Sequence, residues 1–223
     1  MAAAAVYVAA LGVDPTVRLY AKPVPAVVLA ILVAASGPGR YPRAIAAGLL
    51  LSAVGDVLLE FPGRFVPGLV AFLLAHVAYT TAFLADERRW RLARAAPFAL
   101  WLLGAFLWLR PGLGPMEGPV VVYMLAIGAM MWRAAARVGG PDEAPGARTA
   151  LVGAVLFGLS DTLIAIDRFR APFPGARYAI ILLYWAGQAG LAASGSARPG
   201  PRRVPGSGTG GGGSGQVIAV TES

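Results

Sequence analysis

Residues 65–85 read FVPGLVAFLLAHVAYTTAFLA, a stretch of 21 residues that contains no Asp, Glu, Lys or Arg. A helix that rises 1.5 Å per residue needs about 20 apolar residues to cross roughly 30 Å of hydrocarbon. At that depth helices satisfy their own backbone hydrogen bonds, whereas open strands do not. The stretch therefore predicts a helix that spans a membrane.

Similar apolar runs recur along the chain, separated by turn-forming residues such as Pro111-Gly112 and Gly139-Gly140-Pro141. They divide the sequence into eight predicted spans, at about 2–13, 23–36, 42–59, 65–85, 92–109, 118–136, 147–166 and 176–194. Because the start of the chain lacks a basic segment, we interpret 2–13 as a short first span and not as a cleaved signal peptide. We expect an all-α, polytopic transmembrane bundle of about eight helices.

The predicted bundle occupies residues 1–195 as one domain. Residues 196–223 are rich in Gly, Pro and Arg, a composition typical of flexible linkers that bury no core. We therefore expect a disordered tail after the last span.

The composition excludes several classes of protein. The chain is 57% hydrophobic and 13% charged, whereas soluble domains carry about 25% charged residues. Its net charge of +8 comes from arginines scattered among short loops, which does not indicate a nucleic-acid partner. With no cysteine and a single histidine, neither a cysteine site nor a multi-histidine site for a metal is possible, and we expect no cofactor.

The distribution of basic residues predicts the orientation of the bundle, because cytoplasmic loops are enriched in Lys and Arg. One side collects 12 of them: Arg40, Arg43, Arg88, Arg89, Arg91, Arg94, Arg133, Arg137, Arg148, Arg198, Arg202 and Arg203. The other side has 7: Arg18, Lys22, Arg64, Arg110, Arg168, Arg170 and Arg177. We therefore expect both termini to be cytoplasmic. The Ala-, Gly- and Arg-rich composition further indicates a bacterial protein of the inner cell membrane.

Two aspartates lie within predicted spans, Asp56 in 42–59 and Asp161 in 147–166. A charged carboxylate at the centre of a bilayer costs about 2.5 to 3.5 kcal/mol on insertion scales, so such residues normally face the bundle interior and serve a function. Each ends a stripe with i, i+4 and i+8 spacing that includes small residues: Gly48-Ser52-Asp56 and Gly153-Phe157-Asp161. An interhelical hydrogen bond or an ion pair with Arg is the structural alternative.

Other polar side chains share helix faces in the same spans. His76 is followed by Tyr79 at i+3, Tyr184 by Gln188 at i+4, and Tyr123 lies alone in its span. These groups are expected to face inward, either to bind a ligand or to hydrogen-bond between helices. Three further acids lie at span ends, where we expect them to face water: Glu60, Glu117 and Asp167.

Lys22 is the only lysine among the 19 basic residues and directly precedes Pro23 at the start of the second span. Its ammonium group is placed to meet a lipid phosphate. The alternative is that the side chain simply extends to the headgroup region, as lysines at span ends commonly do.

At these positions the sequence resembles the YhhN-like family of membrane proteins, the lysoplasmalogenase family, over about residues 15–194. The matching elements are Lys22-Pro23, Gly55-Asp56, residues 68–72 with His76 and Tyr79, Tyr123, residues 153–161, and residues 184–188. The resemblance implies an eight-helix enzyme that hydrolyses the vinyl ether bond of lysoplasmalogens, releasing a fatty aldehyde and a glycerophospho-headgroup. Its partners would be this lysophospholipid and the membrane lipids, with no protein partner identified.

The polar residues suit that reaction. Hydrolysis of a vinyl ether needs an acid to protonate the β-carbon and a base to activate water, and two carboxyls can do both, as in glycosidases. We therefore expect Asp56 and Asp161 to be the catalytic acid and base, in an order that the sequence does not assign. The other expected substrate-binding residues are Lys22 for the phosphate, together with His76, Tyr79, Tyr123, Ser160, Tyr184 and Gln188.

Two other functions are compatible with buried acids. Paired intramembrane carboxylates also serve as proton relays in transporters, although the chain has neither an inverted repeat nor a matched pair of broken spans. A lipid-binding protein without catalysis, in which the carboxylates hold an ethanolamine headgroup, is the third possibility.

Overall fold

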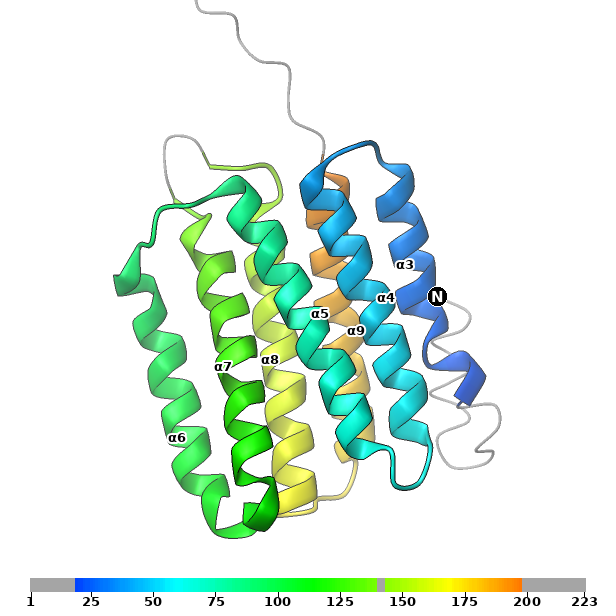
Figure 1. Cartoon of the computed structure of the whole chain (residues 1–223), viewed down its shortest axis with the longest axis vertical. Coiled ribbons are helices and arrows are strands. Elements are labelled where there is room, and N and C mark those ends of the chain that lie inside the picture. The colour runs from blue at the N-terminus through cyan, green and yellow to red at the C-terminus, as the bar shows by residue number, and fades with distance from the viewer. Residues whose placement is uncertain (1–18, 140–142, 198–223) are drawn as a thin grey trace, which may run out of the picture.

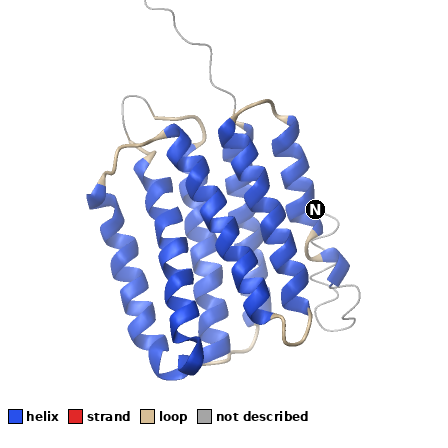
Figure 2. Ribbon diagram, in the orientation of Figure 1, coloured by secondary structure: helices blue, strands red, loops and turns tan. Residues whose placement is uncertain are grey.

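The computed structural model describes residues 19–139 and 143–197, and within these ranges it contains helices and no strand (Figure 2). Its α-helices are α3 (Val24–Ala35), α4 (Arg40–Glu60), α5 (Phe65–Asp86), α6 (Ala96–Leu113), α7 (Glu117–Ala136), α8 (Ala147–Phe169) and α9 (Ala176–Ser196). Two short 3-10 helices, η1 (Leu92–Ala95) and η2 (Gly114–Met116), precede α6 and α7. The prediction of an all-α fold is confirmed for the part of the chain that the structure describes.

These helices coincide with the second to the eighth predicted spans. The first predicted span, 2–13, lies outside the described residues, as does the predicted tail beyond residue 197. Within the described residues, four helical stretches are long and apolar enough to cross a membrane: Arg40–Glu60, Phe65–Asp86, Leu92–Ala136, which folds back on itself, and Ala147–Phe169. The chain is therefore a multi-pass membrane protein.

The end of α6 differs from the prediction, because the helix runs through Pro111-Gly112 to Leu113 and does not stop at residue 109. A proline in the last turn removes one hydrogen bond but leaves the rest of the helix intact. Gly112 is needed here because a Cβ atom would lie 1.8 Å from the carbonyl oxygen of Phe169. The end of α6 thus touches the end of α8 through a glycine.

Six helices form a closed ring in the order α3, α4, α5, α7, α8 and α9, with each helix packed on the next and α9 packed on α3. Contacts between α4 and α9 cross the ring. α6 lies outside it, against α7 and α8, at the edge of the bundle (Figure 1). Polar groups that face the ring interior are thereby shielded from the surrounding lipid.

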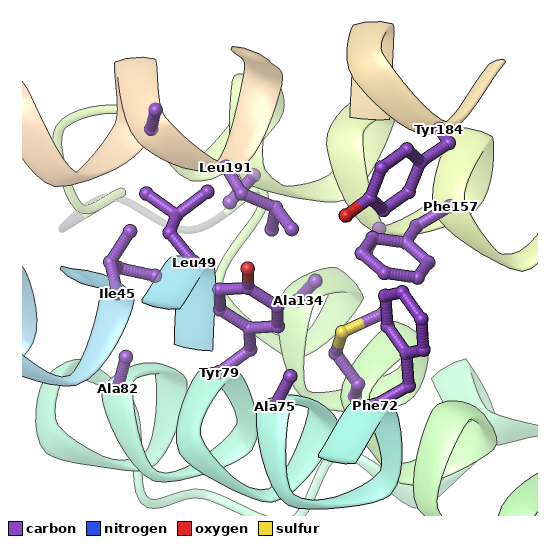
Figure 3. Close-up of a cluster of buried hydrophobic side chains, with 14 of the residues drawn as sticks. Ile45, Leu49, Phe72, Ala75, Tyr79, Ala82, Ala134, Phe157, Tyr184 and Leu191 are labelled. Atoms are coloured by element: carbon purple, nitrogen blue, oxygen red, sulfur yellow. The ribbon is translucent and has the colours of Figure 1, made fainter. Parts of the chain in front are cut away.

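Aromatic and aliphatic side chains fill the ring. Tyr79 lies at the centre, with Leu49 and Leu191 on one side and Phe157 on the other (Figure 3). α6 contrasts with this core, because only Leu109 and Leu113 are buried in it, and Leu100, Leu103 and Leu107 are exposed. An apolar outer surface of this kind suits lipid and not water.

Two buried arginines near the end of α7, Arg133 and Arg137, form hydrogen bonds with neighbouring segments at one end of the bundle. Arg137 donates to Asp86 and to the Tyr41 hydroxyl, both at 2.7 Å, and Arg133 donates to the backbone carbonyls of Glu87 and Arg89. The backbone N–H of Arg89 donates to the Glu87 side chain and holds the pKa of that carboxyl below its usual value. These contacts tie the loop after α5 to the end of α7.

Close packing of α8 on α9 depends on a glycine at position 153. A Cβ atom at Gly153 would lie 2.7 Å from the Gly187 carbonyl oxygen and 2.7 Å from the Leu191 amide nitrogen. Gly153→Ala is therefore expected to destabilise the protein by about 1–3 kcal/mol, because the rigid backbone of α9 cannot move aside cheaply. Denaturant unfolding of the detergent-solubilised protein measures the change.

The matched control is Gly104→Ala in α6, where a Cβ atom would meet nothing within 4 Å. This change is expected to stabilise the helix by up to about 1 kcal/mol, since alanine is the better helix former. Equal stability changes in the two variants would contradict the packing argument.

Candidate active site

An aspartate, a tyrosine and a histidine from three helices meet inside the ring. The Tyr123 hydroxyl of α7 donates to Oδ2 of Asp161 in α8 at 2.5 Å. Nε2 of His76 in α5 lies 2.9 Å from the Tyr123 oxygen and 3.3 Å from Asp161 Oδ2. The three side chains form one hydrogen-bonded group, which we call the Asp161 cluster.

The His76 ring is fully buried and is held by aromatic neighbours, with its centroid 4.9 Å from that of Phe157 and 5.1 Å from that of Tyr123. Its Nε2 faces two oxygens, whereas its Nδ1 has no hydrogen-bond partner among the described residues. The tautomer with the proton on Nε2 is favoured, because it places the donor against acceptors and leaves only an acceptor unpaired. In this tautomer Nε2–H of His76 donates toward the Tyr123 oxygen, and the Tyr123 hydroxyl donates in turn to Asp161.

A second polar group, the Asp56 cluster, lies deeper between α4 and α9. Oδ2 of Asp56 accepts a 2.6 Å hydrogen bond from Tyr184, whose oxygen accepts one of 2.7 Å from Gln188. Nζ of Lys22 lies 3.9 Å from Asp56 Oδ1 and 3.0 Å from Glu60 Oε1. Glu60, which we expected to face water, is thus part of this cluster, with 18% of its side chain exposed.

An aromatic layer separates the two clusters. Phe157 contacts His76 on one side and Tyr184 on the other, with ring centroids 4.9 and 5.2 Å apart. Phe72 packs edge-on against both Phe157 and Tyr184 (Figure 3). Among the described residues, no hydrogen bond joins Asp56 to Asp161, and each is bound to its own tyrosine.

Asp161 borders a cavity of about 70 Å³ enclosed mainly by α5, α6, α7 and α8. Its polar lining residues are Asp161, Tyr123 and Thr162, and the rest of the wall is apolar. The Asp161 side chain is 13% exposed and that of Asp56 is 1% exposed. Of the two aspartates, Asp161 is therefore the one that a molecule in this cavity would meet.

Tyr79 and Ser160 form contacts between helices. The Tyr79 hydroxyl lies 3.4 Å from Ser52 Oγ, and the ring lies where a Cβ at Gly48 would stand. Ser160 donates to the Ile180 carbonyl of α9 at 2.9 Å. Both side chains are fully buried and neither lines the cavity, so their predicted role in substrate binding would be indirect.

Sequence patterns did not reveal the cavity or the place of Glu60. Glu60 follows Asp56 by four residues, so helical spacing alone could have indicated that both carboxylates share a face. The cavity wall consists of ordinary apolar side chains and carries no such signal. Among the described residues, no three His, Asp or Glu side chains are grouped so that they could hold a metal ion.

Comparison with known proteins gives a consistent set of relatives. A sequence model described as the YhhN family matches residues 17–195. Lysoplasmalogenase TMEM86B of Sus scrofa is 35% identical over 162 residues, covering 72% of this chain and 67% of the relative. The human protein of that name is 36% identical over 173 residues, covering 75% and 70%.

A bacterial relative is also similar. The lysoplasmalogenase of Mycobacterium tuberculosis (strain CDC 1551 / Oshkosh) is 41% identical over 155 residues, covering 65% of this chain and 57% of the relative. No solved structure matches the chain.

Proposed function

Because this chain belongs to the YhhN family, we infer that it is a membrane hydrolase that cleaves the vinyl ether bond of lysoplasmalogens, as the names of its relatives indicate. The observation that carries the proposal is the Asp161 cluster at the wall of an apolar cavity. Such a cavity suits the hydrocarbon of a lysolipid, and its carboxyl group suits acid–base chemistry on the enol ether.

We propose that Asp161 performs the first step as a general acid. Its proton moves to the β-carbon of the vinyl ether, and the positive charge is shared between the α-carbon and the ether oxygen. Since Tyr123 and His76 both contact Oδ2, the other carboxyl oxygen would face the substrate. The product of this step is an oxocarbenium ion next to the Asp161 carboxylate.

In the second step water adds to the α-carbon, and the Asp161 carboxylate takes its proton. The resulting hemiacetal transfers its hydroxyl proton to the ether oxygen, and the carbon–oxygen bond breaks. A fatty aldehyde and a glycerophospho-headgroup with a free hydroxyl are released. Because the water has already given its proton to Asp161, the acid is ready for the next substrate, and the contacts with Tyr123 and His76 hold its carboxyl in place.

Asp56 has a different role in this proposal. It lies behind Phe72 and Tyr184, out of contact with the cavity, and Lys22 is closer to Glu60 than to Asp56. Its negative charge would therefore stabilise the oxocarbenium ion across the aromatic layer. Fixed charges in sites without water have large effects of this kind. Gln188 and Tyr184 would hold the carboxylate in position.

The experiment is to incubate the purified protein with a lysoplasmalogen and, in parallel, with the lysolipid that has a saturated ether at the same position. We expect aldehyde and water-soluble headgroup in equal amounts from the first lipid only, because the second has no double bond to protonate. Ion flux in liposomes without aldehyde would indicate a transporter instead. Binding of intact lipid without cleavage would indicate a lipid-binding protein.

We also propose the placement of the chain in the cell. The loops after α3, α5 and α7 lie at one end of the bundle (Figure 1), and most of the arginines in the described residues lie at this end. That end would be cytoplasmic in a bacterial inner membrane. Asp56 and Lys22 would then lie in the outer half of the membrane. Accessibility labelling of single cysteines in intact cells tests this orientation, with the loops at 61–64 and 171–175 expected to react.

A further inference from the structure

A second hollow lies beside the catalytic cavity, on the outer face of the bundle. It is a groove of about 500 Å³ between α6 and α7, and apolar side chains such as Leu103, Phe106 and Leu125 line it. Leu103 and Leu125 are among the exposed apolar side chains of the described residues. The groove therefore faces the lipid of the membrane.

The two hollows share walls. Leu102 of α6 and Met124 of α7 line both the cavity beside Asp161 and the outer groove. Leu102 fits into a space that a glycine leaves, since a Cβ atom at Gly128 would lie 2.5 Å from Leu102 Cδ1. The wall between the cavity and the groove therefore consists of flexible side chains and not of backbone.

The size of the cavity requires an exit for a lipid chain. About 70 Å³ holds on the order of five groups of the size of water. A lipid chain spans about half of the roughly 30 Å hydrocarbon core, so most of it would extend beyond the cavity. The lining of the groove runs along α7 from Val121 to Trp132, which is about 16 Å at 1.5 Å per residue.

The opposite end of the cavity is suited to the polar part of the lipid. Phe65 and Phe169, at the first residue of α5 and the last residue of α8, line this end. The guanidinium of Arg168 stacks over the Phe65 ring at 3.6 Å from its centroid. A positive charge therefore lies at one end of the cavity, and the apolar groove leads away from the other.

We propose that the alkenyl chain of the substrate leaves the cavity between Leu102 and Met124 and lies in the groove between α6 and α7. The headgroup then lies toward Arg168 and the vinyl ether beside Asp161. This inference rests on the proposed function and adds to it the path of the chain. Because α6 is packed outside the ring and buries few of its side chains, the substrate can enter sideways from the membrane.

The test is Ala129→Trp in α7, which fills the groove at a residue that does not line the cavity beside Asp161, compared with Leu100→Trp on the exposed face of α6, where no pocket is lined. Aldehyde release is measured with a long-chain lysoplasmalogen and with an analogue whose alkenyl chain is short enough to fit in the cavity. For Ala129→Trp we expect kcat/KM with the long chain to fall by about tenfold or more, since single methylenes in apolar pockets change rates by roughly 10–200-fold. Cleavage of the short analogue is expected to stay near the wild-type rate, and Leu100→Trp to match wild type with both substrates.

Equal loss with both substrates, or loss with neither, would overturn the proposed path while leaving the hydrolase function in place. If the wild-type protein cleaves neither substrate, the proposed function fails instead. A second measurement does not depend on the folding of a variant: a lysolipid with a photoreactive group at the end of its alkenyl chain is crosslinked to the wild-type protein. Labelling of peptides around Trp132 and Phe98 supports the path, and labelling confined to other helices overturns it.

Discussion

Asp161→Asn is expected to lower kcat for lysoplasmalogen cleavage by roughly 10²- to 10⁴-fold, the range typical of a lost general acid or base. Asparagine keeps the shape of the side chain and still accepts the hydrogen bond from Tyr123, but it has no acidic proton to give to the β-carbon. KM should change little, because the apolar walls of the cavity remain. Aldehyde release by the purified variant measures the effect.

The control is Glu117→Gln, which removes a carboxylate from an exposed pair with Arg110. Exposed ion pairs contribute at most about 1 kcal/mol, so stability and kcat should both stay close to the wild-type values. Thermal unfolding of the Asp161 variant must match that of the wild type. A folded Asp161→Asn protein with normal kcat would show that another group protonates the substrate.

Much of the fold is predictable from the sequence because a membrane helix is recognised from its own long apolar stretch, without knowledge of tertiary contacts. The stretch at 65–85 is long and apolar, and it is observed as α5 with one additional residue at its end, Asp86. The break predicted at Phe61-Pro62-Gly63 falls between α4 and α5 as expected, whereas most of the break predicted at Gly139-Gly140-Pro141 lies outside the described residues. The break predicted at Pro111-Gly112 is wrong, because α6 continues through both residues to Leu113. The glycine there serves a close contact with Phe169 of α8, a tertiary effect that local sequence does not show.

The candidate site is predictable in its members but not in its arrangement. Because a charge inside a membrane is costly, Asp56 and Asp161 are identified from the sequence as candidate functional residues. Helical spacing likewise places Tyr184 and Gln188 on one helix face. That Tyr184 binds Asp56 while Tyr123 binds Asp161 depends on which helices are neighbours. The sequence left the two acids equivalent, whereas the packing of the ring places one at the cavity and the other behind an aromatic layer.

This asymmetry distinguishes the two aspartates in experiment. Asp56→Asn is expected to lower kcat by roughly 10²- to 10³-fold, the usual cost of removing one fixed group that stabilises charge in a transition state. Asparagine still accepts the hydrogen bond from Tyr184, so the site should stay intact. KM is expected to remain unchanged, because Asp56 does not line the cavity that holds the substrate.

Steady-state kinetics on lysoplasmalogens with ethanolamine and with choline headgroups separate this role from binding. If Asp56 instead held an amine in the headgroup, its loss would raise KM for ethanolamine and choline lysoplasmalogens and leave kcat near the wild-type value. A fall in kcat alone, equal for both headgroups, supports a charge that acts on the oxocarbenium ion. Of the two aspartates, Asp161 is the one that lines the cavity and protonates the substrate. Without that protonation no cation forms for Asp56 to stabilise. The variant that lacks both aspartates should therefore be hardly slower than Asp161→Asn.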